Sequence, residues 1–106
     1  MTDLQIQLDL PLEKIEEFCR RWNIVEFALF GSVLRDDFRP DSDVDVLVTF
    51  GNNSRWSLFD IVDMREELMK IFGREVDFVE RGAVEESRNY IRRKAILNSA
   101  KTIYVA

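Results

Sequence analysis

The sequence predicts an α/β fold in which a small mixed β-sheet is flanked by helices. Short apolar runs with β-branched residues at 25–30, 43–50 and 75–80 are typical of strands. Helical apolar spacing separates the last two runs and also precedes the first. Only about twelve residues join the first two runs, and so short a connection favours a mixed rather than a uniformly parallel sheet.

The first element is a helix over residues 11–22, with Pro11 near its start, where proline is tolerated. Its apolar residues fall on one face at helical spacing: Leu12, Ile15, Cys19 and Trp22. Cys19 is the only cysteine of the chain, so it cannot form an internal disulfide. We expect it to pack in the core as a small apolar residue.

A second helix begins at Ser57 and runs to about Phe72. Ser57 and Asp60 form a capping-box pattern at its start, and Gly73 is a natural stop at its end. Its expected inward face consists of Leu58, Ile61, Val62, Leu68, Met69 and Phe72.

The remaining segments are shorter or more polar. Residues 32–38 fit a helical turn, whereas residues 39–42 and 51–56 fit loops. Residues 84–100 fit another long helix with a thin apolar face, and residues 102–105 fit a final short strand.

Length and composition indicate a single domain over residues 1–106. The chain is 46% hydrophobic, enough for a core, and 33% charged, as in globular proteins. The sequence contains neither a signal peptide nor the ~20 apolar residues of a membrane span. We therefore expect a cytoplasmic protein that does not contact membranes.

Charge is unevenly distributed along the chain. The formal net charge of -5 argues against a general nucleic-acid-binding module, so direct nucleic-acid binding is not expected. Residues 1–80 carry 18 acidic and 9 basic side chains, whereas residues 81–106 carry 2 and 6. The basic segment from Arg88 to Lys94 could contact a partner, reach phosphates or face solvent, and the sequence leaves these readings open.

The chain has no histidine. Histidine metal sites, Ser-His-Asp triads and Cys-His pairs are therefore excluded. Any catalysis must use carboxylates, hydroxyls, Lys, Arg or backbone groups.

Three aspartates stand in strand-like apolar runs. Asp43 and Asp45 are one residue apart and share a strand face, and Asp77 lies between Val76 and Phe78. Neighbouring carboxylates repel each other and lose solvation, and a divalent cation such as Mg²⁺ removes both costs. If the third strand lies beside the second, the three acids converge. Two ions about 3.5–4 Å apart would then favour phosphoryl or nucleotidyl transfer.

Gly31 and Ser32 follow the first strand. Gly31 has no Cβ to obstruct a phosphate, and the N–H groups after it begin a turn of helix, where anions bind well. The Ser32 hydroxyl adds a donor. Arg35 would share a face with Ser32, and it could touch a phosphate or pair with Asp41.

A calcium-binding loop is another interpretation of the acids from Asp41 onward. The sixth position of such a loop requires glycine and is Val46, and the twelfth requires a bidentate acid and is Asn52. An EF-hand is therefore rejected.

The combination of these motifs is more specific than any one of them. A strand, Gly-Ser, about ten residues, D-x-D entering a second strand and a carboxylate on a third resemble the DNA polymerase β-type nucleotidyltransferase superfamily. The stretch GSVLRDDFRPDSDVDVLV and the length are similar to its smallest members, the minimal nucleotidyltransferase (MNT) domains. These are the antitoxin halves of prokaryotic HEPN/MNT toxin–antitoxin pairs. The resemblance covers nearly the whole chain and implies the polymerase β-like nucleotidyltransferase fold.

The resemblance also implies roles and a reaction. Gly31 and Ser32 would hold the triphosphate of ATP. Asp43 and Asp45 would bind both Mg²⁺ ions, and Asp77 would complete the metal that activates the acceptor. An acceptor hydroxyl would attack the α-phosphate of ATP and release pyrophosphate. In this family the acceptor is a tyrosine of the cognate HEPN ribonuclease. Attachment of AMP to that tyrosine silences the ribonuclease.

One residue departs from the family pattern, and two other functions stay open. Many relatives have glycine just after the arginine, where this chain has Asp36, an acid that would weaken ATP binding if it pointed inward. The alternatives are an antitoxin that blocks its toxin by binding alone, and a nucleotidyltransferase for a small molecule or RNA. Known enzymes of the latter kinds are larger, and the acidic body disfavours RNA.

Overall fold

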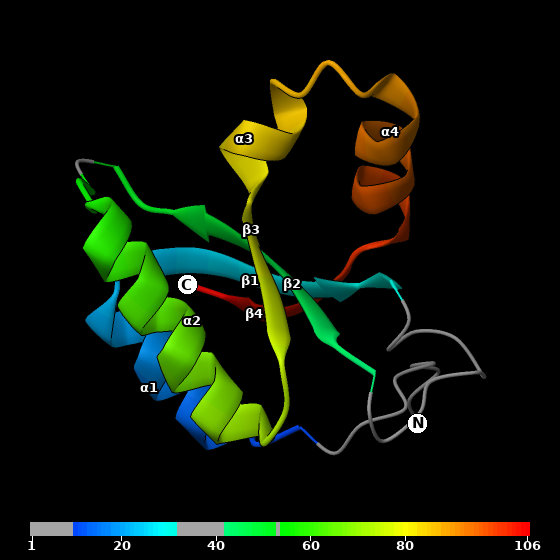
Figure 1. The fold of residues 1–106 in the computed structure, drawn as a ribbon. Coiled ribbons are helices and arrows are strands. Elements are labelled where there is room, and N and C mark those ends of the chain that lie inside the picture. The colour runs from blue at the N-terminus through cyan, green and yellow to red at the C-terminus, as the bar shows by residue number, and fades with distance from the viewer. Residues whose placement is uncertain (1–9, 32–41, 53) are drawn as a thin grey trace.

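The structure, a computed structural model, describes residues 10–31, 42–52 and 54–106. Four helices and four strands follow one another along these residues, and Figure 1 shows their arrangement. The elements in chain order are α1 (Leu12–Arg21), β1 (Ile24–Phe30), β2 (Val44–Phe50), α2 (Leu58–Phe72), β3 (Val76–Glu80), α3 (Arg81–Glu85), α4 (Tyr90–Ser99) and β4 (Lys101–Val105).

The strands form one mixed sheet in the order β3-β2-β1-β4. β1 pairs antiparallel with both β2 and β4, whereas β2 and β3 are parallel. The predicted mixed sheet flanked by helices is therefore confirmed. The four predicted strands are all present, and β2 begins one residue later than expected, so Asp43 directly precedes it.

The two faces of the sheet carry different layers. Figure 1 shows α1 and α2 together on one side of the sheet, with α3 and α4 on the other. The side of α1 and α2 holds the larger core cluster, whose buried members are Ile15, Phe18, Cys19, Ile24, Phe27, Leu29, Val44, Val46, Val48, Met64, Leu68 and Val76. The side of α3 and α4 holds a smaller cluster of Ala28, Phe30, Leu47, Val84 and Ile96. The strands supply both clusters because their side chains alternate between the faces.

The ends of α2 follow the prediction. Ser57 Oγ accepts from the backbone N–H of Asp60, and the Asp60 carboxylate accepts from the backbone N–H of Ser57. Gly73 ends the helix in the left-handed conformation, at φ 72°. At this end the N–H of Gly73 donates to the carbonyl of Met69 at 2.8 Å. The bonds at both ends satisfy backbone groups that would otherwise lack a partner at a helix terminus.

The predicted inward face of α2 is only partly right. Leu68 is buried, and three other predicted members, Ile61, Met69 and Phe72, pack against the larger core. Leu58 and Val62 were expected inside but are exposed, at 77% and 44%. The core side is defined by Met64 and Leu68, and Val62 lies about 200° around the helix from Met64.

The predicted face of α1 is also shifted. Ile15 and Cys19 are buried as expected, but Leu12 is exposed and the buried Phe18 was missed. Phe18 is three residues after Ile15 and four before Trp22, so it lies at the centre of the apolar stripe. Burial, and secondarily the Glu16 charge, raises the pKa of the Cys19 thiol to about 12.

The long helix predicted over residues 84–100 is wrong, because the structure has α3 and α4 there. Each helix has its own cap: the Glu80 carboxylate accepts from the N–H groups of Gly82 and Ala83, and Asn89 accepts from the N–H of Arg92. The N–H of Asn89 donates to Ser87 Oγ. These local side-chain bonds compete with a continuous helix. None of the helices in the described ranges is long and apolar enough to cross a membrane.

Candidate active site

Two of the predicted acids lie side by side on neighbouring strands. Asp45 of β2 is the register partner of Asp77 of β3. Partners on parallel strands present their side chains on the same face. Because Val44 and Val46 belong to the larger core, the two carboxylates lie on the opposite face, toward α3 and α4. The condition for convergence of the acids, that β3 lies beside β2, is met.

Contacts at the start of β2 fix this register. The N–H of Val44 donates to the carbonyl of Glu75 at 2.9 Å, which begins the ladder between β2 and β3. The guanidinium of Arg74 donates to the carbonyl of Ser42 at 3.2 Å. Asp43, between these anchored residues, is exposed. The β2–β3 pairing therefore places Asp43 directly before β2 and Asp45 at the second residue of the strand.

Gly31 lies against the carboxylate of Asp45. It directly follows β1, whose last residue, Phe30, is the antiparallel partner of Asp45. Gly31 has φ +76°, and a Cβ at this position would overlap the Asp45 carboxylate, with Cγ only 3.0 Å away. The backbone conformation therefore favours glycine here, and a Cβ would force the Asp45 carboxylate to move. The first residue of the predicted phosphate loop is thus beside Asp45, one of the predicted metal ligands.

Arg92 of α4 reaches one of these carboxylates, that of Asp77. Its Nη2 is 3.8 Å from Oδ2 of Asp77, and both side chains are about half-exposed. Sequence reasoning placed this arginine only within the segment from Arg88 to Lys94, without a role. The sequence carries no signal for this contact, because Arg92 approaches Asp77 only through the folding of the chain. α4 reaches the sheet after the connection from α3 turns the chain back (Figure 1).

The other predicted nucleotide-binding residues lie outside the described residues. They are Ser32 and Arg35, together with the two acids that bear on them, Asp36 and Asp41. Their roles stay predictions.

The chemistry of the donor set fits a hard divalent cation, although its side chains do not enclose one. Carboxylate oxygens are the ligands that Mg²⁺ prefers, and Asp45 and Asp77 present them in register. Within the part of the chain that the structure describes, no group of three Asp, Glu, Cys or His side chains could hold a metal ion as placed. Asp43, Asp45 and Asp77 are thus close in the fold without forming a closed three-ligand group.

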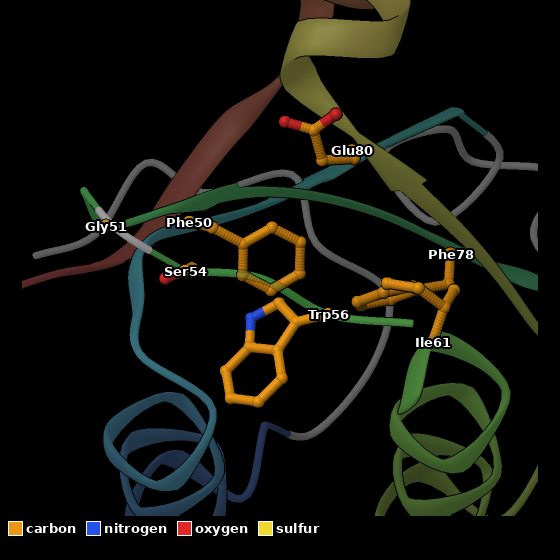
Figure 2. A pocket seen from close by; sticks show the side chains of 7 residues that line it. All are labelled: Phe50, Gly51, Ser54, Trp56, Ile61, Phe78 and Glu80. Carbon is orange, nitrogen blue, oxygen red and sulfur yellow. The ribbon is translucent and has the colours of Figure 1, made fainter. Parts of the chain in front are cut away.

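A large pocket lies elsewhere on the molecule. It has a volume of about 530 Å³ and is lined by Phe50, Gly51, Ser54, Trp56, Ile61, Phe78 and Glu80. Figure 2 shows the Phe50 and Trp56 rings side by side, with Ile61 and Phe78 across from them. These four apolar residues pack against the larger core, and Phe50 ends β2. The pocket is therefore on the other face from Asp45, and at the other end of the strand.

Comparison with known proteins bears on the family of this chain. The family model described as a nucleotidyltransferase domain matches residues 12–101. Protein adenylyltransferase MntA of Thermococcus cleftensis is 33% identical over 84 residues, which cover 72% of this chain and 83% of the relative.

Solved structures share the fold. A chain in a crystal structure of a toxin–antitoxin with AMP-PNP matches with a TM-score of 0.69 at 17% identity, over 92% of this chain and 75% of that one. Another matching chain comes from a complex of tri-AMPylated Shewanella oneidensis HEPN toxin with MNT antitoxin. Its TM-score is 0.61 at 16% identity, over 90% of this chain and 70% of that one. With this fold, and with a family match that spans most of its length, the chain belongs to the nucleotidyltransferase-domain family.

Proposed function

We propose that this chain is a Mg²⁺-dependent protein adenylyltransferase. It transfers AMP from ATP to a tyrosine hydroxyl of a HEPN-type toxin and thereby neutralises that partner. The observation that carries the proposal is the register pair of Asp45 and Asp77 beside Gly31. The relative that is named a protein adenylyltransferase supports the choice of reaction. The chain of similar fold from a complex with an AMPylated HEPN toxin supports the choice of acceptor.

The carboxylates would hold the cation and the loop would hold the nucleotide. Asp45 and Asp77 supply oxygen ligands from two strands, and Asp43 supplies a third from the strand mouth. A divalent cation bound there would stabilise charge on the phosphoryl oxygens as a Lewis acid. Gly31 lets the backbone approach the triphosphate without a Cβ in the way, and Ser32 and Arg35 are the donors that follow it in sequence.

The reaction is a substitution at the α-phosphorus of ATP. The acceptor oxygen forms a bond to the α-phosphorus, and the bond from that phosphorus to the bridging oxygen breaks, so pyrophosphate leaves. The hydroxyl proton goes to a carboxylate, and Asp77 is the one placed for this. β3 is an edge strand, and the side chain of Asp77 is 48% exposed. A hydroxyl on a protein surface can therefore reach it.

The test is transfer of label to the purified partner. The protein is incubated with ATP labelled at the α-phosphate, Mg²⁺ and the HEPN-type toxin encoded beside it. We expect labelled toxin, no labelling after chelation of the metal, and at least about 100-fold less transfer by Asp45→Asn. Asp63→Asn, which makes the same chemical change on an exposed position of α2, should transfer as the wild type does.

Two results would contradict the proposal. If the toxin stays unlabelled in an assay where another adenylyltransferase labels its own substrate, this chain is not an adenylyltransferase for that toxin. Survival of cells that express toxin with the Asp43→Asn/Asp45→Asn variant would show that binding alone neutralises the partner.

A further inference from the structure

The ion pair between Arg92 and Asp77 links α4 to the predicted metal ligands. The distance of 3.8 Å joins Nη2 of Arg92 to Oδ2 of Asp77. Asp77 is in turn the register partner of Asp45. A positive charge therefore lies beside Asp77, one of two neighbouring carboxylates whose chemistry suits a divalent cation.

The local structure of α4 directs Arg92 toward the sheet. Asn89 caps the helix by accepting from the backbone N–H of Arg92 at 3.1 Å, which fixes the main chain at this residue. Ile96, four residues later, is buried in the smaller core cluster. Residues four apart lie on the same helix face, so Arg92 points to the sheet as Ile96 does.

The other cations of the segment from Arg88 to Lys94 are engaged differently. Arg93 donates to the carbonyls of Glu85 and Ser87, which ties α4 to the end of α3. Lys94 lies over the Tyr90 ring, 5.9 Å from its centroid. Within the described ranges, Arg92 is the only one of these cations with an ion pair to a predicted site residue.

Arg92 and a divalent cation must compete for Asp77. Two cations on one carboxylate repel each other, and an ion pair between side chains this exposed is weak. A doubly charged ion with a second ligand at Asp45 can therefore displace the guanidinium. The displaced side chain has space, because Arg92 also lines a cavity of about 140 Å³ with Ser87 and Arg93.

We infer that Arg92 is a further functional residue of this site, with two successive partners. It neutralises Asp77 until a divalent cation binds, and the guanidinium then turns to a phosphate oxygen of the bound nucleotide. The planar fork of arginine matches phosphate as well as carboxylate, so the same side chain can serve both. The inference deepens the proposed function and rests on it for the nucleotide.

The test measures metal binding and transfer on the same variants. Binding of Mn²⁺ to the nucleotide-free protein is followed by electron paramagnetic resonance, and transfer is followed with ATP and the toxin. Arg92→Met should bind Mn²⁺ about two- to five-fold more tightly than the wild type, because its competitor is gone. The same variant should transfer AMP at least about ten-fold more slowly, with the loss mainly in KM for ATP. Arg92→Lys should have a Mn²⁺ affinity and a KM for ATP between those of the wild type and Arg92→Met.

Arg88→Met is the matched control. It removes the same charge from a nearby exposed position that has no ion pair within the described residues. It should leave both Mn²⁺ affinity and KM for ATP unchanged. Arg92→Met is expected to bind Mn²⁺ more tightly but to transfer AMP more slowly. A misfolded variant would instead lose both Mn²⁺ binding and AMP transfer, so the two explanations can be separated.

Each outcome has a definite meaning. Equal Mn²⁺ affinity in the Arg92→Met, Arg88→Met and wild-type proteins overturns the competition, and an unchanged KM for ATP in Arg92→Met overturns the phosphate contact. Weaker Mn²⁺ binding by both Arg92→Met and Arg92→Lys also overturns the inference. Failure of the wild type to bind Mn²⁺ or to label the toxin contradicts the proposed function instead.

Discussion

At the scale of the single residue, Gly31 is the most constrained position near the carboxylates. Alanine there would have to adopt φ +76° and would also push against the Asp45 carboxylate. We expect Gly31→Ala to weaken Mn²⁺ binding by about 10–100-fold, as the loss of a group that orients a ligand typically does. It should also lower the free energy of unfolding by more than the roughly 1–2 kcal/mol of the backbone term alone. Metal titration and urea unfolding measure the two effects.

Gly73 offers a control for the backbone term. It has φ +72°, and a Cβ there would meet nothing within 4 Å. Gly73→Ala should therefore cost about 1–2 kcal/mol of stability and leave metal binding unchanged. Equal losses of stability with normal metal binding in both variants would show that Asp45 does not depend on Gly31.

Cys19 gives a prediction about reactivity. The thiolate is the nucleophile in alkylation, and burial raises the pKa of this thiol to about 12. Iodoacetamide at pH 8 should therefore modify the native protein no faster than it unfolds, and should modify the urea-unfolded protein at the rate of a free thiol. Labelling is read by mass spectrometry. Rapid labelling under native conditions would contradict the burial of Cys19.

The same thiol links stability to pH. Its folded-state pKa is raised above the ordinary value of 9.0, so folding favours the protonated form. This contribution is fully present below about pH 9 and is lost as the pH rises toward 12. The free energy of unfolding of the wild type should fall more steeply above pH 9 than that of Cys19→Ala. Parallel slopes in urea titrations at several pH values would exclude the thiol as the cause.

At the scale of the element, signals within a few residues of one another predicted the structure well. The capping box at Ser57 and the glycine at Gly73 set the ends of α2, because both act through the adjacent backbone. The break between α3 and α4 was not predicted, because Val84 and Ile91 are seven residues apart, a spacing that also fits one continuous helix. The break instead follows from local bonds of the Ser87 and Asn89 side chains. The inward faces of α1 and α2 were only partly predicted, because the faces that they bury depend on the sheet they pack against.

The cap of α2 can be tested separately from the site. Ser57→Ala removes the acceptor for the N–H of Asp60 and should cost about 1 kcal/mol of stability. Ser57→Asp retains an acceptor at the N-cap and should recover most of that loss. Because α2 covers the face opposite the carboxylates, neither variant should change Mn²⁺ affinity. Thermal unfolding and metal titration of the pair would check this.

At the scale of the whole molecule, the candidate site depends on strand order. The sequence identified Asp43, Asp45 and Asp77 by their unusual placement in apolar strands, but it placed them together only on the condition that β3 lies beside β2. That neighbourhood results from the crossover through α2 and is a property of the whole sheet. The contact of Arg92 with Asp77 was not predictable for the same reason, because it depends on how α4 packs on the second face.

The two layers of the molecule should therefore have separable effects. Met64 belongs to the larger core beneath α2, and Ile96 belongs to the smaller cluster beneath α4. Truncating either buried side chain to alanine should cost about 2–5 kcal/mol of stability. Only Ile96→Ala loosens the helix that presents Arg92, so only this variant should slow AMP transfer per folded molecule.

The comparison is made at a temperature where both variants remain folded by circular dichroism. Met64→Ala should retain the wild-type rate and the wild-type KM for ATP. Ile96→Ala should raise KM for ATP in the direction of Arg92→Met, and adding Arg92→Met to it should cause less than the sum of the two losses. Equal slowing by Met64→Ala and Ile96→Ala would show that general stability, and not the layer of α3 and α4, controls the site. A rate that falls only with Ile96→Ala, although both variants lose stability, would assign the alignment of the reacting groups to the layer of α3 and α4.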